Sequence, residues 1–221
     1  MNDLPPRQRR REPTTVRRLP EKQVRDRTTL DAVLDAALAA HVAVVDARVP
    51  HVVPFGCARD GDELLVHGST ASRAMRLLAT GLPTCATVTL LDGVVVARSQ
   101  FESSMRYRSA MVFGSFQVLH GREKARGLQV LSRRLLPGVE GQRPPSDREL
   151  AATAVLALPL ETWSLKVSDG FGEDTAEDLD RPVWAGVVPL HHVWGEPVPA
   201  PDLDPSRVAP AAVHAWPRGR S

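Results

Sequence analysis

Short apolar runs separated by tight turns are the feature that most restricts the fold of this chain. Three such runs follow one another at residues 41–46, 51–59 and 63–67. Arg48-Val49-Pro50 is expected to join the first two runs, and Asp60-Gly61 joins the second to the third. Asp-Gly suits a two-residue hairpin because glycine tolerates the positive φ that the turn requires. The pattern predicts a three-stranded antiparallel meander.

The same pattern continues through the chain, interrupted by a few helical segments. Further strands are expected at residues 84–91, 94–100, 106–120, 155–160, 163–167 and 183–190, with Asp92-Gly93 as the hairpin turn between the first two. Helices are expected after a cap at Thr28 or Thr29, after Arg73, over 123–135, and after the capping box Ser146-Asp-Arg-Glu149. Many short strands in hairpins favour a β-barrel with helical additions over a parallel doubly wound sheet.

Both ends of the chain differ in composition from its middle. They are rich in Pro and Arg and poor in large apolar residues, so they bury little surface to offset the entropy lost on ordering. We therefore expect a disordered basic tail at 1–25, one folded domain at 26–200, and a disordered Pro/Arg-rich tail at 201–221.

The basic N-terminal tail raises the question of nucleic-acid binding, although the formal net charge of the whole chain is only +2. A basic tail can contact nucleic acid. The body of the chain has no basic stripe and no interleaved aromatic platform, however, so we favour a solvated tail and do not expect a nucleic-acid partner.

The cysteines and the hydropathy of the sequence indicate in which cellular compartment the protein is expected. Cys57 and Cys85 lie within apolar, strand-like runs, which is typical of buried free thiols rather than of a disulfide. The sequence has no apolar signal segment at its start and no run long enough to cross a bilayer. We expect a cytoplasmic protein with no membrane partner.

The segment His67-Gly-Ser-Thr-Ala-Ser-Arg73 carries the clearest chemical signal. It places small residues, three hydroxyl groups and an arginine between a strand end and the start of a helix. The first N–H groups of a helix lack internal partners, and the helix dipole favours an anion there. Ser69, Thr70 and Ser72 can donate hydrogen bonds to a phosphate, and Arg73 can pair with its oxygens. The alternative is that one hydroxyl caps the helix and Arg73 is solvated.

Six segments, in order along the chain, resemble those of the pyridoxamine 5'-phosphate oxidase-like flavoproteins, and most closely their nitroimidazole-resistance-like branch. They are Val52-Val-Pro-Phe55, Leu64-Leu-Val-His-Gly-Ser-Thr-Ala-Ser-Arg73, Thr87-Val-Thr-Leu-Leu-Asp-Gly93, Ser104-Met-Arg-Tyr-Arg-Ser-Ala-Met-Val-Phe-Gly114, Pro145-Ser-Asp-Arg-Glu-Leu150 and Pro182-Val-Trp-Ala-Gly-Val-Val-Pro-Leu190. The resemblance covers about residues 18–200. It implies a six-stranded split β-barrel that forms a homodimer and binds FMN at the subunit interface. It also implies flavin-dependent oxidoreductase activity on a small-molecule substrate.

The resemblance assigns roles to individual residues. It implies that the flavin phosphate is held by the loop residues Gly68, Ser69, Thr70, Ser72 and Arg73, and that the polar edge of the flavin is contacted by the backbone of Val53, Pro54, Phe55 and Gly56. Tyr107, Arg108 and Ser109 match a segment that reaches the flavin from the partner subunit or shapes the interface; one face of a barrel strand is the alternative. Trp184 matches a tryptophan at the far edge of the cleft, with core or interface packing as the alternative. Close relatives often have Gly where this chain has Ala71, which predicts a tighter phosphate loop.

His67 is the one candidate for proton chemistry. It aligns with a family histidine beside the cofactor, and an imidazole can exchange a proton near neutral pH as the flavin is reduced. A strand-end histidine bonded to a backbone carbonyl is the alternative. His191-His192 does not predict a metal site, because neighbouring strand residues point to opposite faces and no Cys/His cluster accompanies them.

Several reactions fit these residues, including nitro-compound reduction, an oxidase reaction and deazaflavin-linked reduction. Two rival functions also fit. One is a non-catalytic barrel that carries flavin or haem, and the other is a nucleic-acid-associated regulator that uses the Arg-rich tail.

Overall fold

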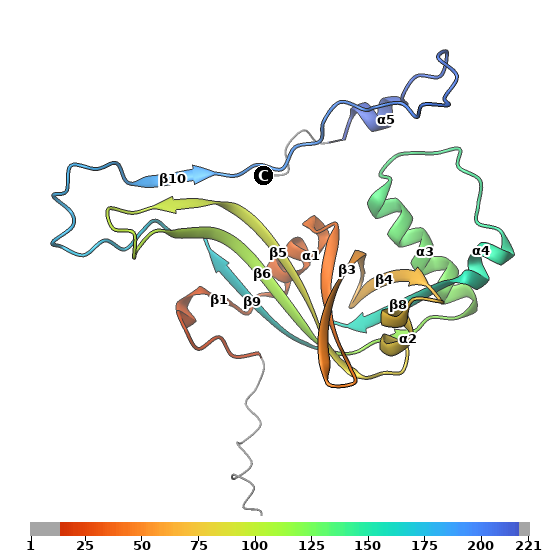
Figure 1. The fold of residues 1–221 in the computed structure, drawn as a ribbon, viewed down its shortest axis with the longest axis horizontal. Helices are drawn as coiled ribbons and strands as arrows, with labels where there is room; N and C mark the ends of the chain where they lie inside the picture. Colours follow the sequence, from red (N-terminus) through yellow and green to blue (C-terminus); the bar gives the residue numbers. More distant parts are fainter. Residues whose placement is uncertain (1–13, 217–221) are drawn as a thin grey trace, which may run out of the picture.

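The computed structural model describes residues 14–216, which form one strongly curved antiparallel sheet with helices packed around it (Figure 1). The strands are β1 (Gln23–Val24), β2 (Ala39–Asp46), β3 (Val49–Asp60), β4 (Glu63–Ser69), β5 (Pro83–Val96), β6 (Ser104–Ser115), β7 (Gln117–Val118), β8 (Thr153–Pro159), β9 (Thr162–Ser168) and β10 (Gly186–Pro189). The helices are the 3-10 turn η1 (Pro20–Lys22) and α1 (Arg27–Ala36), α2 (Arg73–Leu78), α3 (Gly121–Leu135), α4 (Asp147–Ala152) and α5 (Ala211–His214).

The sheet runs in the order β1-β9-β6-β5-β2-β3-β4-β8-β7, and β10 pairs with β5. The two halves of the sheet meet at β3. This strand pairs with β2 over residues 49–56 and with β4 only from Cys57 to Asp60. One edge of residues 49–56 is therefore not paired with β4, and the barrel is split at this place. The predicted split β-barrel is confirmed, with ten strands, several of them very short, instead of six.

The predicted meander is confirmed at β2, β3 and β4. Gly61 has a φ of 59° in the β3–β4 turn, as the Asp60-Gly61 dipeptide predicted. The β2–β3 turn lies slightly earlier than expected, at Ala47 and Arg48, whose φ values are 46° and 70°. Positive φ at both central positions is the conformation whose twist matches that of the flanking strands.

The predicted hairpin turn at Asp92-Gly93 is wrong. β5 continues through this dipeptide to Val96, and its pairing with β6 only shifts register between Leu91 and Gly93. Gly93 serves another purpose, because a Cβ at this position would lie 2.7 Å from the carbonyl oxygen of Val188 in β10. The glycine therefore permits the close approach of β10 to β5.

The predicted strand over 106–120 is also interrupted. β6 ends at Ser115, the side chain of Phe116 is buried in the main core, and the chain then pairs β7 with β8. In one continuous strand, side chains would alternate between the two faces of the sheet along the whole length. The strand therefore has to break before the chain can leave β6 and pair with β8.

The main core fills the inside of the curved sheet, and α1 closes it with Leu30, Val33 and Leu34. The cap of α1 is Asp26 rather than the predicted Thr28 or Thr29. Its side chain accepts a 2.7 Å hydrogen bond from the backbone N–H of Thr29, which satisfies one of the unpaired donors at the helix start.

A second, smaller core lies between the sheet and α3. It contains the buried side chains Ala58, Leu65, Leu119, Leu131, Val155 and Ala157. Gly127 lets α3 approach the sheet closely, since a Cβ there would lie 3.1 Å from Cγ1 of Val155 and 3.2 Å from Cδ1 of Leu119. This contact fixes α3 over β4 and β8.

Described residues on both sides of the predicted domain limits of 26 and 200 contact the folded part of the chain. At the N-terminal side, Gln23 and Val24 of β1 pair with Lys166 and Leu165 of β9. Residues 1–13 and 217–221 of the two predicted tails lie outside the described residues. At the C-terminal side, Figure 1 shows the chain passing from β10 to α5 near α3. None of the helices in residues 14–216 combines the length and hydropathy needed to cross a bilayer.

Candidate functional site

The end of β4 places His67 on the side of the sheet that α3 covers. Leu64 and Val66 point into the main core, whereas Leu65 packs in the second core under α3. Because side chains alternate along a strand, His67 follows Leu65 on the α3 side. The strand is held in place there by antiparallel pairing, in which His67 lies opposite Val155 of β8.

His67 lines a cavity of about 570 Å³, a volume within the usual range for ligand pockets. Its other walls come from Leu128 and Ser132 of α3, from Arg143 of the following loop, and from Leu150 of α4. Elements far apart in the sequence therefore meet at one imidazole.

The imidazole of His67 has an unusual environment. Its Nδ1 is buried and has no hydrogen-bond partner among the described residues. Burial lowers the pKa of His67 below its ordinary value, because desolvation disfavours the charged form. The side chain is thus a neutral imidazole at neutral pH, able to accept a proton, to hydrogen-bond or to ligate a metal ion.

A charged pair stands at the mouth of the cavity. Arg143 donates from both terminal nitrogens to the Glu149 carboxylate, at 2.7 and 2.6 Å. Glu149 also completes the predicted capping box with Ser146, and the neighbouring Arg143 guanidinium holds the pKa of Glu149 well below its usual range. The guanidinium is largely exposed, so it is accessible to an anionic group that enters from the solvent.

The loop that carries Arg143 is tied to the C-terminal part of the chain. The indole N–H of Trp216 donates a 2.8 Å hydrogen bond to the carbonyl oxygen of Pro137. Trp216 also contacts Trp194 edge to face, with 5.2 Å between ring centroids. Trp216, which the sequence placed in a disordered tail, is therefore bonded to the loop that also carries Arg143.

The predicted phosphate loop adjoins His67. The Ser72 hydroxyl caps α2 by accepting from the N–H of Met75, and the Ser69 hydroxyl accepts from the N–H of Ala71. Both hydroxyls retain an O–H that can donate to a ligand. Thr70 donates its hydroxyl hydrogen to the carbonyl oxygen of Ala152 at 3.2 Å, so that hydrogen is already engaged.

Arg73 pairs with Asp46 at the end of β2, and its side chain is 67% exposed. Gly68 faces the interior, where a Cβ would lie 2.9 Å from Cγ of Met75. A glycine is therefore required by packing at this position, whether or not a phosphate binds next to it.

The predicted backbone contacts lie on the open edge of β3. Residues 53–56 pair with β2 but not with β4. Val53 and Phe55 pack toward the main core, whereas Gly56 lies beside His67: a Cβ there would be 4.0 Å from Cε1 of the imidazole. Unpaired backbone groups can offer hydrogen bonds to a planar polar ligand.

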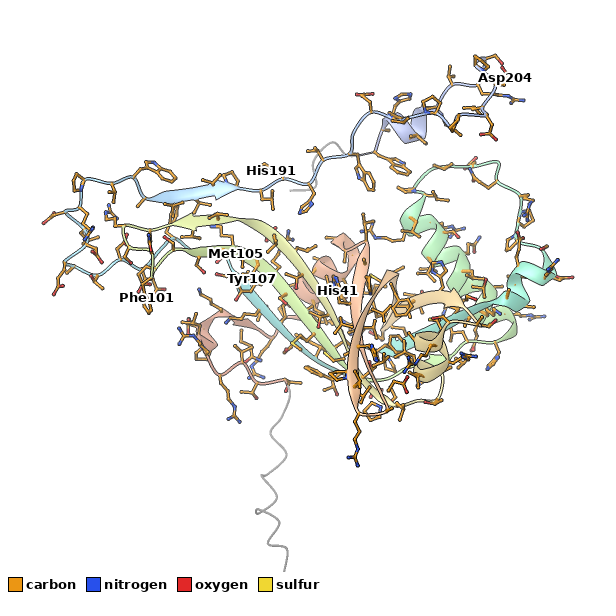
Figure 2. The ribbon with its side chains drawn as sticks, in the orientation of Figure 1. His41, Phe101, Met105, Tyr107, His191 and Asp204 are labelled. Atoms are coloured by element: carbon orange, nitrogen blue, oxygen red, sulfur yellow. The ribbon has the colours of Figure 1, made fainter. Side chains whose placement is uncertain are left out.

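The second group of predicted residues lies elsewhere in the chain. Tyr107, Arg108 and Ser109 belong to β6, and β5 and β2 separate this strand from β3. Arg108 donates to the Asp92 carboxylate at 2.7 and 2.9 Å, and the Ser109 hydroxyl lies 3.2 Å from that of Thr89. Figure 2 shows Tyr107 on β6, in the part of the long β5–β6 pair that projects away from the core, and His41 on β2. Within a single subunit, these three residues therefore do not lie beside His67.

Trp184 lies before β10, and its indole covers Gly186, where a Cβ would be 2.7 Å from Cζ2 of the ring. The side chain remains 64% exposed. His191 and His192 follow β10 and are also exposed; Figure 2 shows His191 on the C-terminal stretch.

The cavity walls formed by α3, α4 and the loop between them were not predicted from the sequence. The available signal was the capping box at Ser146-Asp-Arg-Glu149, which predicted the start of α4. Nothing local to that segment indicated that it would lie beside His67.

Comparisons with known proteins place the fold in a family. The family model described as pyridoxamine 5'-phosphate oxidase matches residues 26–167. No curated protein matches the chain.

Many solved structures resemble the chain, and three of them are described here. The FAD and haem binding protein from Mycobacterium smegmatis is 45% identical, with a TM-score of 0.86, over 90% of this chain and 98% of that one. The flavocytochrome Anf3 from Azotobacter vinelandii is 35% identical, with a TM-score of 0.86, over 92% of this chain and 96% of that one. A protein described as a 5-nitroimidazole antibiotic resistance protein, from Bacteroides thetaiotaomicron, is 24% identical, with a TM-score of 0.55, over 66% of this chain and 86% of that one. The last of these supports the fold alone. From these matches, the chain belongs to the pyridoxamine 5'-phosphate oxidase family.

Proposed function

We propose that the protein binds a flavin and acts in electron or hydride transfer with a small-molecule partner. The observation that carries this proposal is the 45% identity to a FAD and haem binding protein over 90% of the chain. That similarity extends well beyond residues 26–167 of the family match, so it includes much of the segment that contributes Trp184 and β10.

FAD is the flavin that we propose, whereas the sequence resemblance implied FMN. The protein from Mycobacterium smegmatis is named for FAD. Both flavins carry the same ring system and a phosphate next to the ribityl chain, so the proposed contacts apply to either one.

The proposed flavin site combines three neighbouring features of this chain. The open edge of β3 at residues 53–56 supplies backbone hydrogen bonds to the ring, and Ser69, Ser72 and Arg73 supply donors to a phosphate. The bound flavin supplies the redox chemistry, while the chain supplies binding, orientation and electrostatics. His67 lies beside Gly56 at the end of this edge and supplies a neutral base next to the proposed ring position.

We propose in addition that two copies of the chain form a homodimer. Val45, Val52 and Met111 are exposed on the outer face of the sheet, while Val44, Val53 and Val112 next to them pack in or against the core. Exposed apolar side chains on one face of a sheet are candidates for an interaction surface. A second copy on this face would bring Tyr107, Arg108 and Ser109 of one subunit toward the open β3 edge of the other.

Haem is the second group that we propose for this chain. The relatives at 45% and 35% identity are a FAD and haem binding protein and a flavocytochrome. The observation in this chain that favours haem is His67, a half-buried histidine that lines the cavity.

The visible spectrum of the purified full-length protein tests this function. We expect flavin absorption bands, with FAD as the flavin released on denaturation and identified by chromatography, and a Soret band if haem is also bound. Release of FMN alone would replace FAD by FMN in the proposal. A colourless protein that takes up neither FAD nor FMN on titration would refute flavin binding.

A further inference from the structure

We propose that the C-terminal residues 190–216 form a strap that contacts and holds a second copy of this chain. This inference rests on the homodimer of the proposed function and deepens it, because it names the segment that joins the two subunits. The strap begins at Leu190, directly after β10, and ends at Trp216, the last described residue. Figure 1 shows it running from β10 to α5 near α3, and Figure 2 shows His191 at its start standing apart from His41 on β2.

Both ends of the strap are fixed to the folded part of the chain. At its start, β10 pairs with β5, and the backbone N–H of Leu190 donates a 3.1 Å hydrogen bond to the carbonyl oxygen of Asp92. At its end, the indole N–H of Trp216 donates to the carbonyl oxygen of Pro137 at 2.8 Å. The two anchors therefore determine where the strap lies.

Between these anchors the strap has little contact with its own chain. Nearly every residue from 190 to 210 is exposed. Its valines are among the most exposed apolar side chains of the described chain, at 66% for Val193, 89% for Val198 and 85% for Val208. Ordering a segment costs conformational entropy, which burial of apolar surface usually offsets. Because the strap buries little against its own chain, we infer that another molecule covers it.

The anchors lie on two borders of the outer face of the sheet, which is the face opposite the main core. At one border, β10 extends this face beside β5 and is antiparallel to it, so the chain leaves β10 in the direction of β2. At the other border, α3 covers the face at Ala58 of β3, and the loop after α3 holds Trp216. A segment that joins two borders of one face can hold a molecule that packs on that face.

The outer face between these borders has no charged side chain at its paired positions. Every outward-pointing paired position of β2, β5 and β6 is occupied by a residue other than Asp, Glu, Lys or Arg. Two rows of paired residues cross the face: one holds Met105, Val94 and Val188, and the other holds Met111, Thr87 and His41. A partner that covers this face must itself be uncharged there, because an unpaired charge is costly to bury.

A second copy of the chain meets this requirement, since it presents the same uncharged face. Two-fold symmetry makes such a contact self-complementary, and two-fold dimers are the commonest oligomers. A stable interface uses about 20–30 residues on each side, a number that the strap and the outward positions of the three strands together provide. In this dimer the strap of each subunit lies against the other subunit.

Charges introduced into the strap of the full-length protein test the inference. We expect Val198→Asp combined with Val208→Asp to raise the dissociation constant of the dimer at least about tenfold, because the new charges would be buried without a partner. Sedimentation equilibrium measures this constant. Leu82→Asp is the matched control: this leucine is 47% exposed in the turn between α2 and β5 and should leave the dimer unchanged. Both cores are built from residues up to Val167, so the strap variant should fold.

The unchanged protein provides an independent test that needs no variant. Arg207 is the one Lys or Arg between residues 190 and 216, and it is exposed, so trypsin can cut the strap after this residue. If a partner covers the strap, cleavage there should become slower as the protein concentration rises through the dissociation constant of the dimer. Mass spectrometry identifies the chain that ends at Arg207.

Three results would overturn the inference. If the strap variant and Leu82→Asp dimerise equally well, the strap does not hold the partner, although the dimer stands. If cleavage after Arg207 has the same rate constant at every protein concentration, the partner does not cover the strap. If the unchanged protein is a monomer throughout, the inference and the homodimer fail together, while flavin binding is decided separately by titration with FAD.

Discussion

Replacing Leu131 with alanine is expected to lower the free energy of unfolding by about 2–5 kcal/mol, because a buried leucine leaves a cavity when it is truncated. Leu131 is only 1% exposed and lies in the second core with Leu65 and Val155. It is the only fully buried leucine of α3. The substitution therefore weakens the attachment of α3, and with it the wall that carries Leu128 and Ser132.

Equilibrium unfolding in urea, followed by circular dichroism, measures this effect. The midpoint should fall while the slope of free energy against denaturant stays constant, since a changed midpoint at constant slope reports stability. Leu136→Ala is the matched control: this leucine follows the same helix but is 43% exposed. We expect it to change stability by no more than about 0.5 kcal/mol. Equal effects of the two substitutions would contradict the role of the second core.

Replacing Arg73 with alanine is expected to lower the affinity for FAD and FMN roughly ten- to a hundredfold. Hydrogen bonds to charged groups contribute on the order of 1.5–3 kcal/mol, which corresponds to that range. Riboflavin has no phosphate, so its affinity should hardly change. Fluorescence titration with the three flavins measures these affinities, and Arg76→Ala, an exposed arginine of the same helix, is the control.

Arg73 pairs with Asp46, so it could act only as a structural link instead of binding a phosphate. If the arginine only links α2 to the β2–β3 turn, Arg73→Ala should affect all three flavins alike and stability by about 0–1 kcal/mol, the usual contribution of an exposed ion pair. Equal losses for riboflavin and FAD would thus move the phosphate away from this loop.

The sequence predicted the local features of the fold best. Asp60-Gly61 marked a true turn because its conformation depends on two residues and their immediate flanks. The identical dipeptide at Asp92-Gly93 did not, because β10 pairs with β5 there and Gly93 permits the contact with Val188. Tertiary packing overrode the local preference, and that packing involves residues almost a hundred positions apart.

In the candidate site too, the residues that are adjacent in sequence were predicted, and those that tertiary packing brings together were not. The adjacent residues from His67 to Arg73 were predicted together because one strand end and one helix start place them together. Leu128, Arg143 and Leu150 were not predicted, since their position beside His67 depends on α3 packing on the sheet at Gly127. The support from Trp216 was missed because a Pro- and Arg-rich composition predicts disorder.

Native mass spectrometry of the full-length protein, purified from a host that makes both FAD and FMN, tests flavin binding most directly. We expect a species with the mass of two chains and two flavins, and release of the flavins on denaturation. This mass also tests the homodimer. A single chain without a bound flavin, unchanged after incubation with FAD or FMN, would contradict the proposal that this protein is a flavin-binding dimer.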